Sequence, residues 1–171
     1  MAMTTEIPVI RTERLVLRAP VADDFPAYRD FLASPRAVHM GGPFDLRAAW
    51  GMFCNDLAQW TLYGHGCLMI DLLASGQTIG QVGINHGPLF PEKELGWFLY
   101  EGFEGRGYAF EAATAMRDWA FAELGLSSLV SYCDPANKRS IDLALRMDAE
   151  PDPGAKGQDP EDVVLRHHPR A

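Results

Sequence analysis

Four absences limit what this chain can be. Its three cysteines form no C-x-x-C pair, and its histidines form no H-E-x-x-H motif, so we expect a reduced, cytoplasmic protein with no metal site. No stretch approaches the ~20 consecutive apolar residues of a membrane-spanning helix. The first residues also lack the charged and apolar regions of a secretory leader. We therefore predict that the chain does not act at a membrane.

Positive charge is also scarce. Lysine and arginine number 15 against 23 aspartate and glutamate residues, which gives a formal charge of −8. Nucleic acids and anionic membrane surfaces attract positively charged proteins, so we expect no nucleic-acid partner. Any anionic ligand has to be held locally, by backbone amides or by a few arginines. The acidic field favours a neutral or cationic partner.

What the chain does have is enough apolar material for one folded unit. Of its 171 residues 47% are hydrophobic, and a chain of this length buries most of its surface, so we expect a single domain over residues 1–171. Alternating apolar residues predict strands, and apolar residues three or four positions apart predict helices. In chain order these patterns predict a strand at 14–19, helices at 23–32 and 45–64, strands at 67–73, 78–86 and 94–100, a helix at 108–124, a strand at 128–133, a helix at 137–147 and a strand at 162–166.

The order of these elements indicates the fold class. The strands at 67–73, 78–86 and 94–100 follow one another along the chain and predict an antiparallel meander. The strand at 94–100, the helix at 108–124 and the strand at 128–133 form a βαβ unit, whose strands we expect to be parallel with a right-handed crossover. The predicted fold class is therefore α/β.

A glycine-rich segment from Gly102 to Ala109 separates a predicted strand from a predicted helix. Glycine permits positive φ and close approach of a ligand, and the first amides of a helix are free donors. Arg106 adds positive charge, so the segment predicts a local phosphate site. The spacing matches neither G-x-x-x-x-G-K-[ST] nor G-x-G-x-x-G, which argues against nucleoside triphosphates and dinucleotides. A glycine-rich turn without a ligand is the alternative.

Residues 94–112, with the sequence ELGWFLYEGFEGRGYAFEA, resemble the acyl-coenzyme-A-binding signature of the GNAT superfamily of N-acetyltransferases. Further matching segments are Thr12–Arg18, Ile79-Gly80 and Asn137–Ser140, in the family's order and spacing. The closer resemblance is to the branch of ribosomal-protein N-terminal (alanine or serine) acetyltransferases. It implies a GNAT-like single domain, with a mixed, mostly antiparallel central sheet that is splayed between the fourth and fifth predicted strands and flanked by helices.

The resemblance implies acetyl-coenzyme A as the cofactor. Loop amides would hold its pyrophosphate, strand backbone would pair with its pantetheine arm, and Asn137 would lie near that arm. The cleft would form where the strands at 94–100 and 128–133 separate. The implied residues are Glu104, Gly105, Arg106, Gly107, Tyr108 and Ala109 for the pyrophosphate, and Phe98, Leu99 and Tyr100 for the pantetheine.

Two positions depart from the family's pattern. Glu104 stands where Gln or Arg is usual, and a carboxylate there repels a pyrophosphate unless it points away. Many members use a tyrosine four residues before a Gly-Phe pair to protonate the leaving thiolate. Ala144 takes that place here, with Asp148-Ala149 instead of Gly-Phe. The usual general acid is therefore absent.

Transfer of an acetyl group to an amine needs a base, a donor that polarises the carbonyl and a group that returns a proton to sulfur. Glu94 is the first candidate for the base, directly or through a water, and His86 is the second. Ser140 is the candidate proton donor, and strand backbone is the candidate carbonyl donor. The alternatives are a solvated edge carboxylate for Glu94 and a helix cap beside Asn137 for Ser140.

The acceptor side carries weaker marks. By resemblance, the segment His39–Pro43 shapes it, and Trp97 and Tyr63 are candidates to line it, whereas helical spacing assigns Trp50 and Trp60 to the core. We predict an N-acetyltransferase that acts on a primary amine, either a protein N-terminus or a small molecule such as an aminoglycoside-like antibiotic or a polyamine. The rival prediction is a non-catalytic coenzyme-A-binding or sensor module. The sequence is also compatible with a homodimer.

Overall fold

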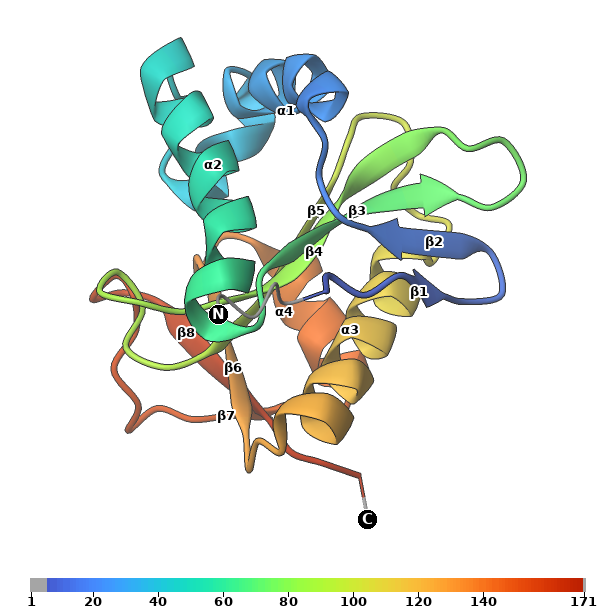
Figure 1. Ribbon diagram of the computed structural model, residues 1–171. Coiled ribbons are helices and arrows are strands. Elements are labelled where there is room, and N and C mark those ends of the chain that lie inside the picture. Colours follow the sequence, from blue (N-terminus) through green and yellow to red (C-terminus); the bar gives the residue numbers. More distant parts are fainter. Residues whose placement is uncertain (1–5, 171) are drawn as a thin grey trace.

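The computed structural model describes residues 6–170, which form an eight-stranded sheet covered by helices (Figure 1). None of the helices in this part of the chain is long and apolar enough to cross a membrane. The strands are β1 (Ile10–Arg11), β2 (Leu15–Arg18), β3 (Cys67–Leu72), β4 (Thr78–Asn85), β5 (Glu94–Leu99), β6 (Leu129–Cys133), β7 (Glu150–Pro151) and β8 (Val163–His167). The helices are α1 (Phe25–Leu32), α2 (Leu46–Tyr63), α3 (Tyr108–Leu124) and α4 (Lys138–Arg146), with short 3-10 helices η1 (Ala22–Asp24) and η2 (Pro35–Met40).

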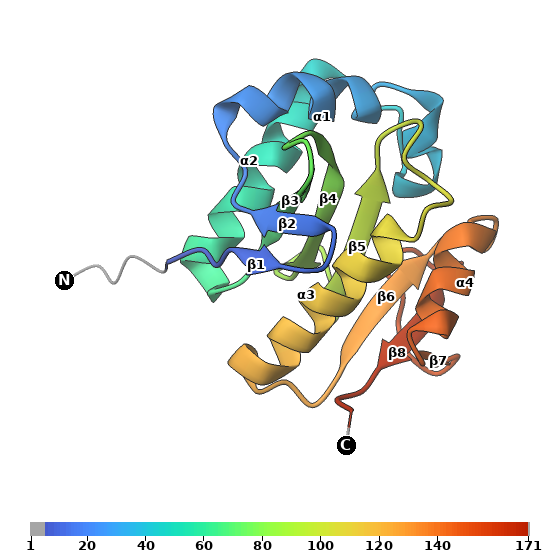
Figure 2. The same ribbon diagram turned by 90° about the vertical axis from the view of Figure 1, so that its right-hand side faces the viewer.

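The sheet is mixed, with the strand order β1-β2-β3-β4-β5-β6-β8-β7. Neighbouring strands are antiparallel except β5 and β6, which are parallel. Glu94 of β5 pairs with Val130 of β6, the one register pair between these strands in residues 6–170. Beyond that pair the two strands diverge (Figure 2). They are the fourth and fifth strands predicted from the sequence, so the mixed, mostly antiparallel sheet and its splay are confirmed.

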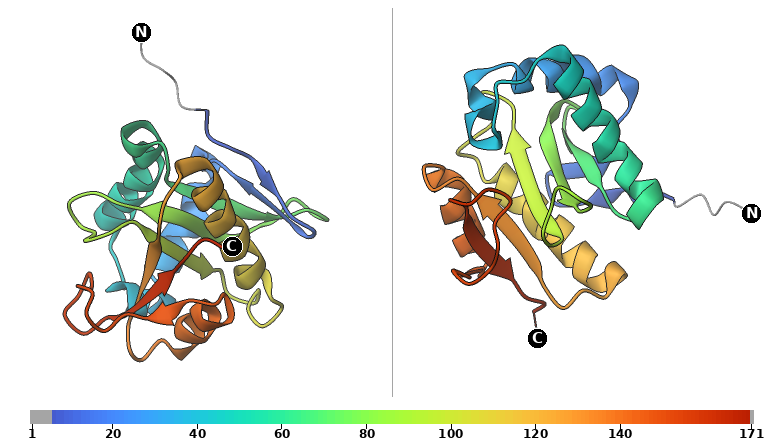
Figure 3. Two further views of the ribbon diagram at one scale, coloured as in Figure 1. Left: turned by 90° about the horizontal axis from the view of Figure 1, so that it is seen from below. Right: turned by 90° about the vertical axis from the view of Figure 1, so that its left-hand side faces the viewer.

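Helices cover both faces of the sheet. The helix α3 lies in front of the strands in Figure 2, and α2 lies over the opposite face in the right-hand view of Figure 3. Ala113, Met116 and Ala120 of α3 are fully buried, whereas Phe110 and Trp119 are half-buried at the rim. The strands contribute most leucines and all isoleucines of the main core: Leu15, Leu17, Leu68, Ile70, Ile79, Ile84, Leu95, Leu99 and Leu129.

A second apolar cluster joins α1 and α2 to the far end of β5. Phe31 of α1 stacks on Phe98 of β5, with 4.3 Å between the ring centroids. The sequence placed two tryptophans of α2 in the core, and the structure separates them. Trp60 is buried as predicted, but Trp50 is 50% exposed. The prediction for Trp50 is wrong because this residue lies at the rim of the cluster, where its ring meets the edge of Phe25.

Local signals at the helix ends were reliable, and very short elements were missed. Asp45, the first residue of the predicted helix, caps α2 by accepting the Ala48 N–H at 2.8 Å, and Asn137 caps α4. The two-residue strands β1 and β7 were not predicted, because two residues show no periodicity. The segment His39–Pro43, expected as a loop, begins inside η2. These differences do not affect the splay or the predicted order of β5, α3, β6 and α4 around it.

Candidate active site

A cavity opens on the sheet where β5 and β6 separate. It has a volume of about 370 Å³, and residues from α1, η2, α2 and the strands β3 to β6 line it. Four of the residues predicted for catalysis or cofactor binding, Glu94, Phe98, Asn137 and Ser140, are among its lining residues. The fold therefore brings the start of β5 and the start of α4 to one cavity, as a shared site requires.

Glu94, the first residue of β5, carries a carboxylate on the cavity wall. The side-chain amide of Asn85 donates a hydrogen bond to its Oε2 at 2.8 Å. Burial raises the pKa of Glu94 to about 7, although the Asn85 hydrogen bond opposes the rise. A carboxyl group that titrates near neutrality exchanges a proton readily at physiological pH. Glu94 is thus a partly buried carboxylate on the cavity wall, and its role as a base stays a prediction.

A second acid, Asp56 of α2, lies in the same cavity and was not singled out from the sequence. It is 9% exposed, and the Tyr28 hydroxyl donates a hydrogen bond to its Oδ2 at 2.8 Å. Burial raises the pKa of Asp56 to about 6 against the effect of its hydrogen bonds. The available signal was its spacing, because Asp56 falls between Phe53 and Trp60 on the apolar side of the helix.

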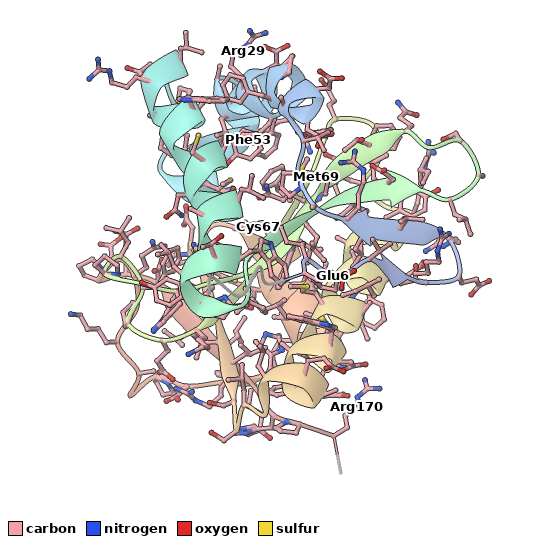
Figure 4. The ribbon with its side chains drawn as sticks, viewed as in Figure 1. Glu6, Arg29, Phe53, Cys67, Met69 and Arg170 are labelled. Atoms are coloured by element: carbon pink, nitrogen blue, oxygen red, sulfur yellow. The ribbon has the colours of Figure 1, made fainter. Side chains whose placement is uncertain are left out.

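Cys67 and Asn85 connect the two carboxylates. Cys67, at the start of β3 (Figure 4), donates its thiol hydrogen to Asn85 Oδ1 at 3.4 Å, and Asn85 in turn donates to Glu94. Burial and the nearby Asp56 charge raise the pKa of Cys67, so its thiol stays protonated. In the part of the chain that the structure describes, neither carboxylate pairs with a lysine or arginine. Buried acids without a cation favour a ligand that brings positive charge.

Asp56→Asn is expected to remove a pH-dependent loss of stability. The pKa of Asp56 is about 6 in the folded protein against an ordinary 3.8, so its stabilising contribution is present at low pH and lost as the pH rises through about 6. Asparagine does not ionise, and its carbonyl still accepts the Tyr28 hydrogen bond. Between about pH 4.5 and about pH 8, wild type should lose ~2 kcal/mol of unfolding free energy relative to the variant. Urea unfolding at both pH values measures this; identical pH dependence in the two proteins contradicts it.

The predicted phosphate loop has the backbone geometry of an anion cradle. Gly102, Gly105 and Gly107 all have positive φ, at 89°, 76° and 80°. Gly107 is the N-cap of α3 and provides no side chain to its first turn, so the leading N–H groups of the helix are free for a ligand. The Gly107 carbonyl accepts the Glu111 N–H at 3.0 Å and starts the helical pattern. The residues present therefore fit a pyrophosphate.

The N-terminal segment holds this loop in place. The Arg14 guanidinium donates to the Arg106 carbonyl at 2.9 Å and to Glu111 Oε2 at 2.7 Å, and it lies 4.6 Å from the Tyr108 ring centroid. The Thr12 hydroxyl also donates to Glu111 Oε1, at 2.6 Å. The matching segment at Thr12–Arg18 thus contributes to the site by fixing the loop and the first turn of α3.

Glu104, the residue that departs from the family's pattern, is neutralised by a distant arginine. Its carboxylate forms an ion pair with Arg36 of η2 and accepts the Gly102 N–H at 3.1 Å. Arg36 also donates to the Leu99 carbonyl at 3.1 Å. The negative charge on the loop therefore has a positive partner, supplied from η2.

The open edge of β5 carries the backbone groups of only one of the three residues predicted for it. The Tyr100 N–H donates to the Ile79 carbonyl at 2.8 Å, in the ladder with β4. Because backbone groups alternate between the two edges of a strand, Phe98 also faces β4, whereas Leu99 and Trp97 face the splay. The prediction that Phe98 and Tyr100 offer backbone groups to the pantetheine arm is therefore wrong. The open edge instead carries the backbone groups of Leu99, as predicted, and of Trp97, which also lines the cavity.

Asn137 and Ser140 form a reciprocal pair at the start of α4. The Ser140 N–H donates to Asn137 Oδ1 at 3.3 Å, and the Asn137 amide donates to Ser140 Oγ at 3.0 Å. Asn137 is the cap residue, so the expected helix-cap arrangement is present. The Ser140 hydroxyl accepts in this pair and keeps its own hydrogen free, so a proton donor on the cavity wall remains available.

The position at which the family's pattern has a tyrosine is occupied by a small, buried residue. Ala144 is completely buried and packs with Cys133 and Leu165. Asp148 has a φ of 64°, the left-handed conformation for which glycine is favoured. Neither Ala144 nor Ala149 offers a hydroxyl at this turn.

Other predicted candidates lie outside the cavity lining. His86, the second candidate base, packs against the Tyr63 ring with 5.6 Å between centroids, and neither residue lines the cavity. Trp50 belongs to a shallow surface hollow with Phe25. His39 does line the cavity, and its Nδ1 lies 2.8 Å from Asp134 Oδ2 across the mouth. Of the segments predicted for the acceptor side, η2 and Trp97 therefore line the cavity.

Comparison with known proteins places these features in a family. The model of the family described as "Acetyltransferase (GNAT) domain" matches residues 14–150. The crystal structure of the acetyltransferase from Agrobacterium tumefaciens str. C58 is 62% identical over 95% of each chain, with a TM-score of 0.93. RimL, a ribosomal L7/L12 alpha-N-protein acetyltransferase solved with coenzyme A, shares the fold at 18% identity and a TM-score of 0.71, over 95% of this chain and 98% of RimL. The uncharacterized N-acetyltransferase YnaD of Bacillus subtilis (strain 168) is 36% identical over 44 residues, 26% of each chain.

Proposed function

The chain belongs to the GNAT acetyltransferase family, and from that premise we propose that it transfers an acetyl group from acetyl-coenzyme A to a primary amine by direct attack. The observation that carries this proposal is the Glu94 carboxylate at the base of the splay, whose pKa is raised by burial and which lines a cavity together with Phe98 of β5 and Asn137 at the start of α4. We propose that the acetyltransferase domain spans residues 1–171.

The cofactor site is proposed from the loop and the open strand edge. The α3 N-terminus, the three positive-φ glycines and Arg106 suit the pyrophosphate. The backbone of Trp97 and Leu99 suits the pantetheine arm, with Asn137 on the opposite wall. RimL, which shares the fold, is a coenzyme A complex. Coenzyme A would supply the acetyl group as a thioester, whose carbonyl is the electrophile.

Each step of the transfer is proposed for a residue of this chain. Glu94 takes a proton from the acceptor ammonium, directly or through a water, and leaves a neutral amine. A backbone N–H on the open edge of β5 polarises the carbonyl oxygen as negative charge develops there. As the attacking nitrogen bonds to the carbonyl carbon and the C–S bond breaks, Ser140 would pass a proton to sulfur and regain one from that nitrogen, which gives up its second proton as the amide forms. Ser140 is proposed for this step because Ala144 offers no hydroxyl. The raised pKa of Glu94 suits this role, because a carboxylate that titrates near neutrality can both take up and release a proton at physiological pH.

The acceptor is proposed to be a cationic amine, either a small molecule or a protein N-terminus. Asp56 and Glu94 give the cavity two acids without a cationic partner among residues 6–170. Aromatic rings, which attract cations through their faces, also line the cavity: Tyr28, Phe44, Phe90, Trp97, Phe98 and Tyr132. The volume of about 370 Å³ is at the small end for ligand pockets.

A non-catalytic coenzyme-A-binding module is the second candidate function. The observation that favours it is Ala144, which is buried where many relatives of this family carry the tyrosine that protonates the thiolate. Both candidates require cofactor binding, and only the first releases thiol in the presence of an amine.

Calorimetric titration of the purified protein with acetyl-coenzyme A tests the shared requirement. We expect a dissociation constant on the order of micromolar, because the loop offers amides and one arginine to the phosphates. Dephospho-coenzyme A and a nucleotide without the pantetheine arm serve as controls for the parts of the ligand. Absence of any binding contradicts the proposal, whereas binding without thiol release from any amine selects the second candidate.

A further inference from the structure

The 3-10 helix η2, Pro35–Met40, touches both sides of the splay. In Figure 2 this segment lies between the far end of β5 and the start of α4. Arg36 reaches β5 and the cofactor loop, through the Leu99 carbonyl and Glu104. His39 reaches the residue after β6, Asp134, at 2.8 Å. A segment from the acceptor side thus contacts each arm of the cofactor site.

The charges at the loop show what Arg36 does there. The loop contributes one acid, Glu104, and one base, Arg106, near the place proposed for a doubly charged pyrophosphate. Glu104 is held close to that place, because it accepts the Gly102 N–H of the loop itself. Its side chain is 22% exposed and that of Arg36 is 33% exposed, so water screens the pair only in part. Without Arg36, the carboxylate would face the phosphates with its charge uncompensated.

We propose that Arg36 is a positioning residue of the cofactor site, which neutralises Glu104 and so allows a loop that carries a carboxylate to bind pyrophosphate. This inference rests on the proposed function. It identifies a residue about 70 positions before the loop, on the acceptor side, as a determinant of cofactor affinity. It also accounts for a glutamate at a position where the family uses Gln or Arg, because the positive charge is supplied from another segment.

A double-mutant cycle tests the pair, with coenzyme A affinity measured by calorimetry for wild type, Arg36→Ala, Glu104→Gln and the double variant. Arg36→Ala should weaken binding about tenfold or more, because one uncompensated charge then faces the phosphates. Glu104→Gln should bind more tightly than wild type, because the carboxylate is gone and the guanidinium is free. The double variant should recover most of the loss. Arg36→Lys, which keeps the charge, should lie near wild type.

Two controls separate charge from shape. Arg29→Ala removes one positive charge from the outer surface of α1, where Arg29 pairs with the adjacent Asp30 (Figure 4), and it should not change affinity. S-acetylpantetheine carries the acetyl thioester without a pyrophosphate. The loss of kcat/KM in Arg36→Ala should therefore be about tenfold larger with acetyl-coenzyme A than with this donor.

Several results overturn the inference. They are wild-type affinity in Arg36→Ala, a double variant as weak as Arg36→Ala, or an equal loss with both acetyl donors. If Arg36→Ala does not fold, Glu104→Gln decides alone, and unchanged or weaker binding by that variant is contrary. A wild-type protein that binds no coenzyme A refutes the proposed function instead. If wild type binds coenzyme A and the three variants bind it with the same affinity, only the role of Arg36 is refuted.

Discussion

Replacing Glu94 with glutamine is expected to lower kcat/KM for the amine at least about 100-fold, the effect typical of removing a general base. Glutamine has nearly the same shape, and its carbonyl still accepts the Asn85 hydrogen bond that now reaches Glu94. Coenzyme A affinity should change little, because the carboxylate lies at the opposite end of β5 from the loop. The loss should therefore appear in the chemical step and not in cofactor binding.

The pH dependence gives this prediction a second readout. Glu94 acts as a base only when ionised, and burial raises its pKa to about 7. Below that pKa the wild-type rate should rise about tenfold per pH unit, and it should then level off apart from titration of the amine itself. In Glu94→Gln the rise near neutrality should disappear. A variant that keeps both the rate and the inflection refutes the assignment of the base. Glu123→Gln, at the exposed end of α3, is the matched control and should behave as wild type.

Gly107→Trp is expected to weaken coenzyme A binding by about 100-fold or more, because an indole at the head of α3 covers the free N–H groups that an anion needs. The substitution also strains the backbone, since Gly107 has a φ of 80°. An added Cβ would lie 3.4 Å from a terminal nitrogen of Arg14, the side chain that holds the loop. Both effects act at the proposed pyrophosphate site.

A second glycine separates strain from the loss of the site. Gly76, in the turn between β3 and β4, has a φ of 73°, and a Cβ there would meet nothing within 4 Å. Gly76→Trp therefore imposes a similar backbone penalty and the same bulky ring away from the loop. It should lower the unfolding free energy by about 1 kcal/mol and leave coenzyme A affinity unchanged. Equal affinity in Gly107→Trp and wild type, measured by calorimetry, would show that the loop does not hold the phosphates.

The two predictions address separate ends of the proposed site. The glycine substitution concerns the cofactor arm, which is made of local backbone, and the Glu94 substitution concerns the reacting end, where buried side chains from several strands meet. A protein that binds coenzyme A and fails only in Glu94→Gln is a catalyst. A protein that binds it and shows no thiol release in any form is a binding module that has kept the fold.

The sequence by itself determined the features that depend on neighbours in the chain. The glycine spacing before α3, the Asp45 and Asn137 caps and the alternation in β3 to β5 are local, because a turn, a cap or a strand face involves residues only a few positions apart. The parallel pairing of β5 and β6 followed from the long helical connection between them. The strands, the helices and the glycine-rich loop before α3 were therefore predictable before any contact between distant residues was known.

Only the tertiary structure decided which distant side chains meet. Periodicity marks the face of a helix or strand that is buried, and it does not say what lies opposite. It therefore gave no partner for Asp56, and it did not show that Arg36 cancels the charge of Glu104. The assignment of the free edge of β5 to Trp97 and Leu99 also depended on the register with β4. Electrostatic neutralisation, burial and pKa arise from residues that the folded sheet brings together, so the chemistry of this site is a property of the assembled structure.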